Sequence, residues 1–237
     1  MDEMYARTRM LLGSEGMARL RRSRVAVFGL GGVGSYVFEA LVRSGVGAID
    51  VIDNDTVSVS NLNRQLLALR STVGMKKTDA AAARAADIDP KTVIRRFPVF
   101  VTAENAKDFP FAEYDYIVDA IDTVSAKIEL ILRAEEAGVP ILSSMGTGNK
   151  LDPSRLRIAD LSETRYCHLA RVMRKELRRR GIEHVKVIYS EEIPQIREEG
   201  SETKGAQGRP APGSTAFVPP VAGLMIAAEV VRELAGI

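Results

Sequence analysis

The feature that most constrains the fold of this chain is a glycine-rich turn, GLGGVG, at residues 29–34. The turn follows RVAVF (24–28), which has the length and apolar content of a buried strand. It opens into a helical stretch at 33–44 that Gly45 can end. Glycines at this spacing let a phosphate group approach backbone N–H groups at the start of a helix. Together, the strand, turn and helix predict a parallel α/β sheet with a nucleotide site at the turn.

From residue 24 onward, short apolar runs alternate with helical stretches. This is typical of a Rossmann-like, mainly parallel α/β sheet with helices on both faces. We expect strands at 24–29, 48–53, 92–97, 114–122, 139–145 and 184–190, and helices at 33–44, 76–86, 125–137, 169–180 and 221–234.

The predicted organisation is one domain over residues 1–237, with a nucleotide-binding core at about 5–150 and a C-terminal, substrate-side extension at 151–237. Residues 191–215 are rich in Gly, Pro and Glu, which favours a mobile loop within the domain. Apolar structure resumes directly after this loop in the last helix, so we do not expect a second domain.

Composition narrows the class of protein. The net charge of the 237 residues is only +2, so any basic surface that binds nucleic acid must be local. The single cysteine, Cys167, excludes an intrachain disulfide and a multi-cysteine zinc site, and fits a reducing compartment. The longest apolar run, at 217–231, is broken by two prolines and a glycine and is too short to span a bilayer. We expect a cytoplasmic protein, with peripheral membrane attachment through the last helix as the alternative.

Polar residues after the second expected strand indicate chemistry at a phosphate. Asp53 ends that strand, where a carboxylate can accept hydrogen bonds from ribose hydroxyls. The segment SNLNRQ (60–65) follows, and its arginine, Arg64, can clamp phosphate oxygens with two parallel hydrogen bonds. A hydride transfer would not need this segment. The residues Asn61 and Asn63 have a second interpretation, because Asn also favours turns and helix caps.

Two further charges are expected at the same edge of the sheet. Lys76 and Lys77 follow Gly74 at a helix start, so one ammonium group can approach the phosphates while the other stays in solvent. Asp122 follows the fourth strand, at the carboxyl edge where open α/β sheets bind ligands. A carboxylate beside a triphosphate calls for a divalent cation between them, and Mg²⁺ is the natural one. The alternative for Asp122 is a cap on the helix that begins near Ser125.

These motifs resemble a known family. GLGGVGS, DNDTVSVSNLNRQ, VGMKK and DAID have the order and spacing found in the ubiquitin-activating-enzyme-like (ThiF/HesA) superfamily of ATP-dependent adenylyltransferases. The resemblance covers about residues 5–150. Within the superfamily, DAIDTVSAK, SSMGTGNKLDP and CHLARVMRKELRRRG are similar to the tRNA threonylcarbamoyladenosine dehydratases.

The resemblance implies a role for each matching position. ATP phosphates would lie against Gly31 and Gly32, the ribose against Asp53, and Mg²⁺ on Asp122. The triphosphate would be lined by Asn61, Arg64, Gln65 and Lys77, with Lys77 rather than Lys76 as the catalytic lysine.

Near the N-terminus, MYARTRMLLG resembles a motif whose arginine enters the ATP site of a partner subunit. This aligns Arg7 with that role and implies a homodimer. Met4 and Thr8 depart from the usual Arg and Gln of the motif, and Arg9 is a rival for the same role.

The resemblance also implies a reaction. A threonylcarbamoyl carboxylate on a tRNA adenosine would be adenylylated by ATP and then cyclised with net loss of water. Because the second step is intramolecular, it needs no enzyme thiol. We expect Cys167 to be a small core or surface residue, with a reactive cysteine as the alternative. The alternatives are activation of the C-terminal glycine of a ubiquitin-like sulfur carrier, an NAD-binding oxidoreductase, and a non-catalytic ATP-binding partner. Whether a sulfur-transfer partner exists stays open.

A basic run, RVMRKELRRR (171–180), is the main candidate surface for tRNA. On a helix, four of its cations share one side: Arg171, Arg174, Lys175 and Arg178. The alternative is an ordinary solvated helix face. A second basic run, RLRRSR (19–24), is a weaker candidate.

Overall fold

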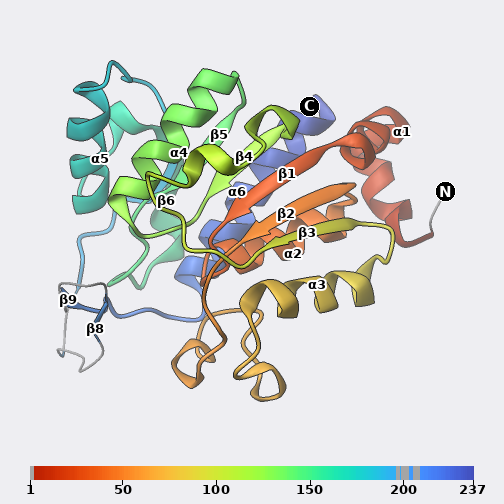
Figure 1. Ribbon diagram of the computed structural model, residues 1–237, viewed down its shortest axis with the longest axis horizontal. Helices are drawn as coiled ribbons and strands as arrows, with labels where there is room; N and C mark the ends of the chain where they lie inside the picture. Colours follow the sequence, from red (N-terminus) through yellow and green to blue (C-terminus); the bar gives the residue numbers. More distant parts are fainter. Residues whose placement is uncertain (1–2, 196–197, 199–202, 205–208) are drawn as a thin grey trace.

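The computed structural model describes residues 3–195, 198, 203–204 and 209–237. Its centre is a seven-stranded sheet with the order β3-β2-β1-β4-β5-β7-β6 (Figure 1). The strands are β1 (Arg24–Phe28), β2 (Ala48–Ile52), β3 (Val93–Phe97), β4 (Tyr116–Asp119), β5 (Ile141–Ser144), β6 (Leu156–Asp160) and β7 (Lys186–Ser190). All neighbouring pairs are parallel except β6 with β7. The predicted fold class, a mainly parallel α/β sheet, is confirmed.

The helices form a layer on each face of the sheet (Figure 1). They are α1 (Ala6–Arg22), α2 (Gly34–Ser44), α3 (Lys77–Ile88), α4 (Val124–Ala137), α5 (His168–Arg178) and α6 (Val218–Ala235). Helix α6 packs on α2 and α1, and α3 packs on α2, whereas α5 packs on α4. Because both faces are covered, the central strands are buried and mainly apolar rather than alternating. Every residue of β4 is buried, as are Val25 to Phe28 of β1.

Glycine ends the predicted helices as expected. Gly45 and Gly138 adopt left-handed backbone conformations after α2 and α4, with φ of 88° and 65°. The last helix starts earlier than the predicted residue 221, at Val218. Its two prolines, Pro219 and Pro220, occupy the first turn, where a missing N–H costs no intrahelical hydrogen bond. The prolines therefore begin this helix and do not interrupt it.

Two elements of the main sheet and its covering helices were not predicted. One is α1, which bends at Gly13, where φ is 70° and ψ is 171°. The other is β6, which pairs antiparallel with β7 at the edge of the sheet. Through β6 and β7, the C-terminal part of the chain extends the same sheet that carries the glycine turn.

The prediction of a mobile loop at 191–215 falls partly outside the described residues, which exclude 196–197, 199–202 and 205–208. Within the described remainder, β8 (Thr203–Lys204) and β9 (Arg209–Pro210) form a short antiparallel ladder. Among all described residues, no helix has the length and apolar character needed to cross a membrane.

Candidate nucleotide site

The glycine turn lies between β1 and α2 at the carboxyl end of the sheet. A Cβ on Gly34 would lie 1.8 Å from the Gly29 carbonyl oxygen, and a Cβ on Gly29 would lie 2.7 Å from the Ala120 oxygen. These two positions accept only glycine, because strand, helix and the end of β4 meet there. Gly31, by contrast, has open space on its Cβ side. The turn thus exposes backbone at Gly31 beside the start of α2, the environment that suits a phosphate.

Asp53 connects the turn to the next strand. One of its carboxylate oxygens accepts a hydrogen bond from the Leu30 N–H at 2.7 Å, and the other accepts one from the Asp55 N–H at 2.8 Å. Burial raises the pKa of Asp53, although the charge of Lys77 and the two backbone N–H groups oppose that rise. Each carboxylate oxygen retains a lone pair, so Asp53 can brace the turn and also accept a ribose hydroxyl.

The structure separates the two adjacent lysines. Lys77 begins α3 and is buried, with its ammonium 2.7 Å from Asp55 Oδ2 and 3.7 Å from Asp53 Oδ2. Lys76 is exposed and only its backbone takes part in the helix start. Of the two, Lys77 is the one beside Asp53, and it has a third N–H available for a phosphate oxygen.

Arg64 packs against the glycine turn at Gly32. Its Cγ is 3.5 Å from the point where a Cβ on Gly32 would be. Its guanidinium donates to the Ser60 carbonyl at 2.9 Å and to Asn63 Oδ1 at 2.8 Å. The turn is therefore in contact with Arg64 at Gly32 and with Asp53, which lies beside Lys77, at Leu30.

The amide residues of SNLNRQ are already engaged in the structure. Asn61 Oδ1 accepts from the Ser58 N–H at 3.2 Å, which caps a short 3₁₀ turn at Val59–Asn61. Asn63 Nδ2 donates to the Ser214 carbonyl at 3.0 Å. Gln65 is buried and donates its backbone N–H to the Asn61 carbonyl. The capping interpretation of Asn61 thus holds, and its Nδ2 is the side that can face a phosphate.

Asp122 follows β4 in the turn at 120–123 and is exposed. This turn is next to Gly29, because the Ala120 oxygen is the atom that a Gly29 Cβ would strike. Among the described residues, no three His, Cys, Asp or Glu side chains group as a metal site. Mg²⁺ is commonly held by one or two carboxylates with substrate phosphates and water completing its shell. One carboxylate next to the glycine turn, that of Asp122, fits that mode.

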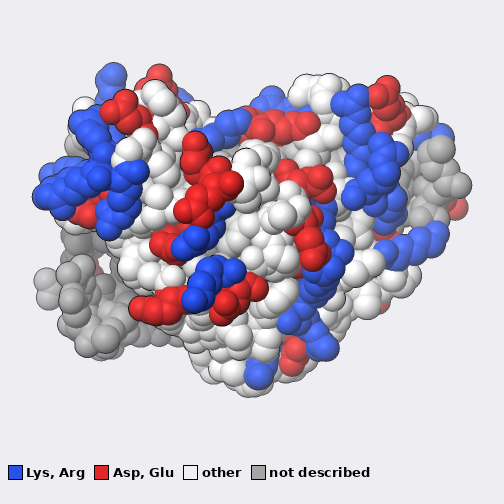
Figure 2. All heavy atoms as spheres, turned by 45° about the horizontal axis from the view of Figure 1, so that its top comes forward, with Lys and Arg blue, Asp and Glu red and all other residues white. Residues whose placement is uncertain are grey.

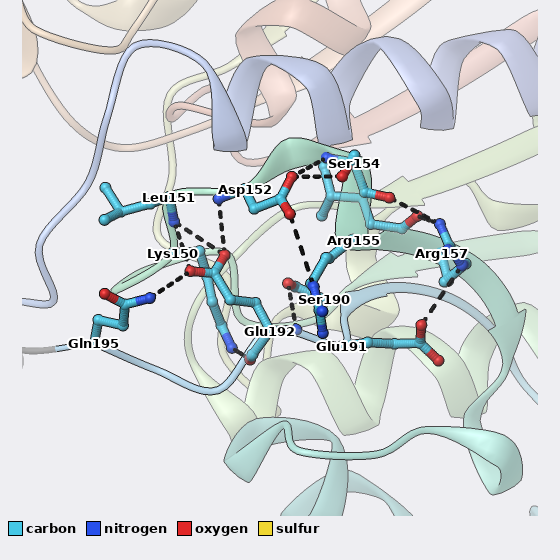
Figure 3. Close-up of polar contacts among 11 residues, drawn as sticks. Lys150, Leu151, Asp152, Ser154, Arg155, Arg157, Ser190, Glu191, Glu192 and Gln195 are labelled. Atoms are coloured by element: carbon cyan, nitrogen blue, oxygen red, sulfur yellow. Dashed lines mark hydrogen bonds and ion pairs between the residues drawn. The ribbon is translucent and has the colours of Figure 1, made fainter.

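The loop MGTGNKLDP follows the carboxyl end of β5, and Figure 3 shows its polar contacts with the segment after β7. The buried Glu192 carboxylate accepts from the Leu151 N–H at 3.0 Å and the Asp152 N–H at 2.9 Å, and the Lys150 ammonium donates to the Glu192 carbonyl. Asn149, with φ of 58°, exchanges two 2.7 Å hydrogen bonds with Gly213. Since Ser214 also accepts from Asn63, this loop and the phosphate-side segment are connected through residues 213–214.

Helix α5 carries the predicted basic face. Figure 2 shows basic side chains gathered over this helix. A shallow pocket of about 430 Å³ at this surface is lined by Arg171, Arg174, Lys175, Arg178 and Arg179. One of the four predicted tRNA contacts differs from the others. Arg174 donates to the carbonyls of Leu161 and Thr164 at 3.1 and 2.9 Å, so its guanidinium fastens α5 to the preceding turn.

Cys167 precedes α5 and serves as its N-cap. Its Sγ accepts from the Ala170 N–H at 3.5 Å and would lie 3.6 Å from a Cβ on Gly146. The thiol is half-buried and engaged as a helix cap, a position compatible with both interpretations of Cys167.

Arg7 lies far from the glycine turn of its own chain. It is exposed on α1, and α1 contacts the amino ends of the strands: the Leu20 carbonyl accepts from the Gly47 N–H, and Arg21 pairs with Asp89 at 2.9 Å (Figure 1). The glycine turn is at the carboxyl ends. The rival Arg9 is on the same helix and lines a pocket of about 370 Å³ with Tyr5 and Arg21.

Two features of the site were missed by sequence reasoning. Asp55 is the nearest partner of Lys77, and its spacing of two residues from Asp53 was the available signal. The Glu192 carboxylate, by contrast, is some forty residues from the backbone it binds, and no local pattern indicates that contact.

The chain belongs to the ThiF family, whose model matches residues 5–237. At the level of individual proteins, it is 43% identical over 242 aligned residues to tRNA threonylcarbamoyladenosine dehydratase of Bacillus subtilis, covering 99% of this chain and 95% of that protein. The crystal structure of Escherichia coli tRNA N6-threonylcarbamoyladenosine dehydratase in complex with ATP has a TM-score of 0.89 and 29% identity, covering 99% of this chain and 94% of that one. A 36% identical match to the adenylyltransferase and sulfurtransferase UBA4 of Vanderwaltozyma polyspora covers 58% of this chain and 31% of that protein.

Proposed function

We propose that this protein adenylylates the threonylcarbamoyl carboxylate of a modified tRNA adenosine with ATP and then closes it into a ring. One observation carries the proposal. The glycine turn is flanked by Arg64 and by the buried Lys77, in a chain that resembles the Bacillus subtilis dehydratase along nearly its whole length. The Escherichia coli relative of similar structure was crystallised in complex with ATP. We propose that residues 1–237 work as a single adenylyltransferase domain in the cytoplasm, where tRNA is modified.

In the first step, a carboxylate oxygen attacks the α-phosphorus of ATP. The bond between the α-phosphorus and the bridging oxygen breaks, and pyrophosphate leaves with the electron pair. Negative charge grows on the bridging oxygen and the leaving phosphates, where a fixed guanidinium and ammonium stabilise it. We assign this stabilisation to Arg64 and Lys77; the support is the contact of Arg64 with Gly32 and the position of Lys77 beside Asp53.

In the second step, the acyl-adenylate is attacked within the same substrate molecule. The carbamoyl oxygen bonds to the threonyl carbonyl carbon, AMP departs with its oxygen, and a carbamoyl nitrogen loses a proton. Relative to the starting nucleoside, one water has been removed. Because nucleophile and electrophile belong to the same threonylcarbamoyl group, the site only has to hold that group in a bent conformation and exclude water. The loop after β5, which contains Asn149 and Lys150 and is bound by Glu192, is the candidate for that task.

We assign Mg²⁺ to Asp122, in the exposed turn next to Gly29. The ion would neutralise phosphate charge and orient the triphosphate when bound. Asp122 would share it with phosphate oxygens, and Asp53 would hold the ribose.

We propose a homodimer in which Arg7 serves the ATP site of the partner subunit. The support is geometric: Arg7 lies at the amino ends of the strands, and the glycine turn lies at the carboxyl ends. An arginine at that place can stabilise pyrophosphate only in a second copy.

For the tRNA we propose contact through the exposed cations of α5, Arg171, Lys175 and Arg178. These side chains form a local basic surface on a chain with little net charge, which is the pattern expected of a phosphate-binding face.

The test is a reaction of the purified protein with ATP, Mg²⁺ and tRNA isolated from cells that make threonylcarbamoyladenosine. Labelled pyrophosphate exchange into ATP reports the first step, and mass analysis of the digested tRNA reports the second. We expect exchange only with the modified tRNA, and a nucleoside lighter by one water. Exchange that requires a ubiquitin-like carrier with a C-terminal glycine instead would favour the adenylyltransferase alternative. Binding of a nicotinamide dinucleotide without ATP turnover would favour the oxidoreductase.

A further inference from the structure

A buried ion pair lies directly beneath the turn that carries Asp122. Asp119, the last residue of β4, and Lys127, in the first turn of α4, are both fully buried, with Nζ and Oδ2 2.8 Å apart. Ser143 of β5 donates its hydroxyl to the same Asp119 oxygen at 2.6 Å. No mechanistic step above uses these three side chains.

The pair forms hydrogen bonds with the peptide groups on both sides of Ile121. Asp119 Oδ1 accepts from the Ile121 N–H at 3.3 Å, and the Lys127 ammonium donates to the Ile121 carbonyl at 3.2 Å. The next residue is Asp122. The preceding residue, Ala120, donates its N–H to the Phe28 carbonyl at 2.8 Å, and its own carbonyl oxygen packs on Gly29. The ion pair therefore holds both peptide groups of Ile121, and the backbone contacts of Ala120 hold the same segment against the glycine turn.

Stability alone does not account for this arrangement. Replacing a buried ion pair by apolar residues of similar size is often neutral or stabilising. A cation in the first turn of a helix also opposes the helix dipole. Lys127 donates its backbone N–H to the Thr123 carbonyl, so it lies at the unfavourable end of α4. A pair kept in this place is better explained by the geometry that it imposes.

We propose that Asp119 and Lys127 are a positioning pair that holds Asp122 where it can share Mg²⁺ with the ATP phosphates. The inference rests on the proposed Mg²⁺·ATP step and adds two residues to it. Neither side chain touches substrate, since both are buried beneath the turn.

The experiment compares ATP binding by calorimetry with and without Mg²⁺ in the wild-type protein and in the double variant Asp119→Asn, Lys127→Met. The double variant keeps side-chain size and leaves no unpaired buried charge, but it frees the Ile121 carbonyl. We expect its ATP affinity without Mg²⁺ to stay within about twofold of wild type. The Mg²⁺ concentration for half-maximal enhancement should rise about tenfold, on the scale of outer-shell effects on metal sites. No tRNA is needed for this measurement.

The matched control is Asp50→Asn with Arg24→Met. This removes another ion pair with a fully buried aspartate, 2.7 Å between Arg24 Nη1 and Asp50 Oδ1, on strands β1 and β2. We expect a comparable loss of thermal stability and an unchanged Mg²⁺ requirement. If the first double variant does not fold, Ser143→Ala, which keeps both charges, should raise the Mg²⁺ requirement by about two- to threefold, a weaker outer-shell effect.

A folded variant of the Asp119 network with a lower melting temperature and the wild-type Mg²⁺ dependence would overturn the positioning role. In that outcome the wild type still binds Mg²⁺·ATP and the proposed function stands. If the wild-type protein binds no ATP at all, the proposed function fails and this inference fails with it.

Discussion

At the scale of single residues, Arg64 is the side chain whose loss should lower activity with the least effect on stability. Its guanidinium donates to Ser60 and Asn63 on the surface, so removing it leaves no buried group without a partner. We expect Arg64→Ala to lower pyrophosphate exchange by about 10²- to 10³-fold, as for other donors that stabilise transition-state charge. Its melting temperature should stay close to wild type.

The control for Arg64 is Arg70→Ala, which removes an exposed arginine a few residues further along the chain, outside SNLNRQ. Its exchange rate should match the wild type. Equal rates for the Arg64 and Arg70 variants would remove Arg64 from the chemistry.

The adjacent lysines give a second, sharper comparison. Lys77 is buried beside Asp53 and Asp55, whereas Lys76 points to solvent. We expect Lys77→Ala to lower exchange by about 100-fold or more, because it removes an ammonium held at the phosphates. Lys76→Ala should be nearly silent in the same exchange assay. A reversal of the two outcomes would show that the phosphates lie elsewhere.

Local motifs indicate some of the candidate site residues. The sequence alone indicates the glycine turn, Asp53, Arg64 and Lys77 as candidates, because each belongs to a motif next to a strand or a helix start. The Asp119–Lys127 pair and Glu192 could not, because their roles depend on strands and helices meeting in three dimensions. Arg174 had the right spacing for a basic face, but its guanidinium binds the carbonyls of Leu161 and Thr164.

At the scale of elements, α1 is attached to the sheet by a small polar cluster. Tyr5 and Arg21 donate to Asp89 Oδ2 at 2.7 and 2.9 Å. Burial by itself would raise the pKa of Asp89, but these hydrogen bonds, with that of the Lys91 N–H, outweigh it and lower the pKa to about 2. A carboxyl with a folded pKa below its ordinary value of 3.8 stabilises the fold above that value, and the contribution is lost as pH falls toward 2.

Replacing that carboxyl should therefore give a pH-dependent loss of stability. We expect Asp89→Asn to lower the free energy of unfolding by about 2 kcal/mol at neutral pH, with the difference from wild type shrinking below about pH 4. Urea unfolding at several pH values measures it. Asp87→Asn, at an exposed position nearby, is the control. A loss that is the same at every pH would mean that the charge of Asp89 does not matter.

On helix α5, substitutions of basic residues by glutamine can distinguish a role in RNA contact from a role in structural support. We expect Arg171→Gln, Lys175→Gln and Arg178→Gln together to reduce the log–log salt slope of tRNA affinity by about 2 to 3, since three phosphate contacts are lost. Arg174→Gln should leave the slope unchanged and lower the melting temperature, because its guanidinium holds the turn before α5. The RNA role of α5 fails if the triple variant keeps the wild-type slope.

The elements that were predicted and those that were missed differ in burial. Strands such as β1 and β4 are buried on both faces and read as continuous apolar runs. The missed strand β6 is an edge strand with one fully buried residue, Leu156, so its pattern is weak. The missed helix α1 buries only Gly16 and Leu20 and bends at Gly13, which removes the periodic apolar face that would reveal it.

At the scale of the whole molecule, the proposed dimer makes a prediction that no single chain can satisfy. Arg7→Ala and Lys77→Ala should each be inactive alone. When the two proteins are mixed and allowed to exchange subunits, a mixed dimer regains one site with Arg7 from one copy and Lys77 from the other. Random pairing predicts recovery to about a quarter of wild-type exchange. If Arg7 acted within its own chain, mixing would restore nothing.

The central claim is that a nucleoside triphosphate binds at the glycine turn between a guanidinium and an ammonium. A crystal structure of the protein with Mg²⁺ and ATP tests it most directly. The account predicts phosphate oxygens in hydrogen-bond contact with Arg64 and Lys77, the ribose on Asp53, and the metal on Asp122. An empty turn after soaking, or a triphosphate bound away from Arg64 and Lys77, would contradict it.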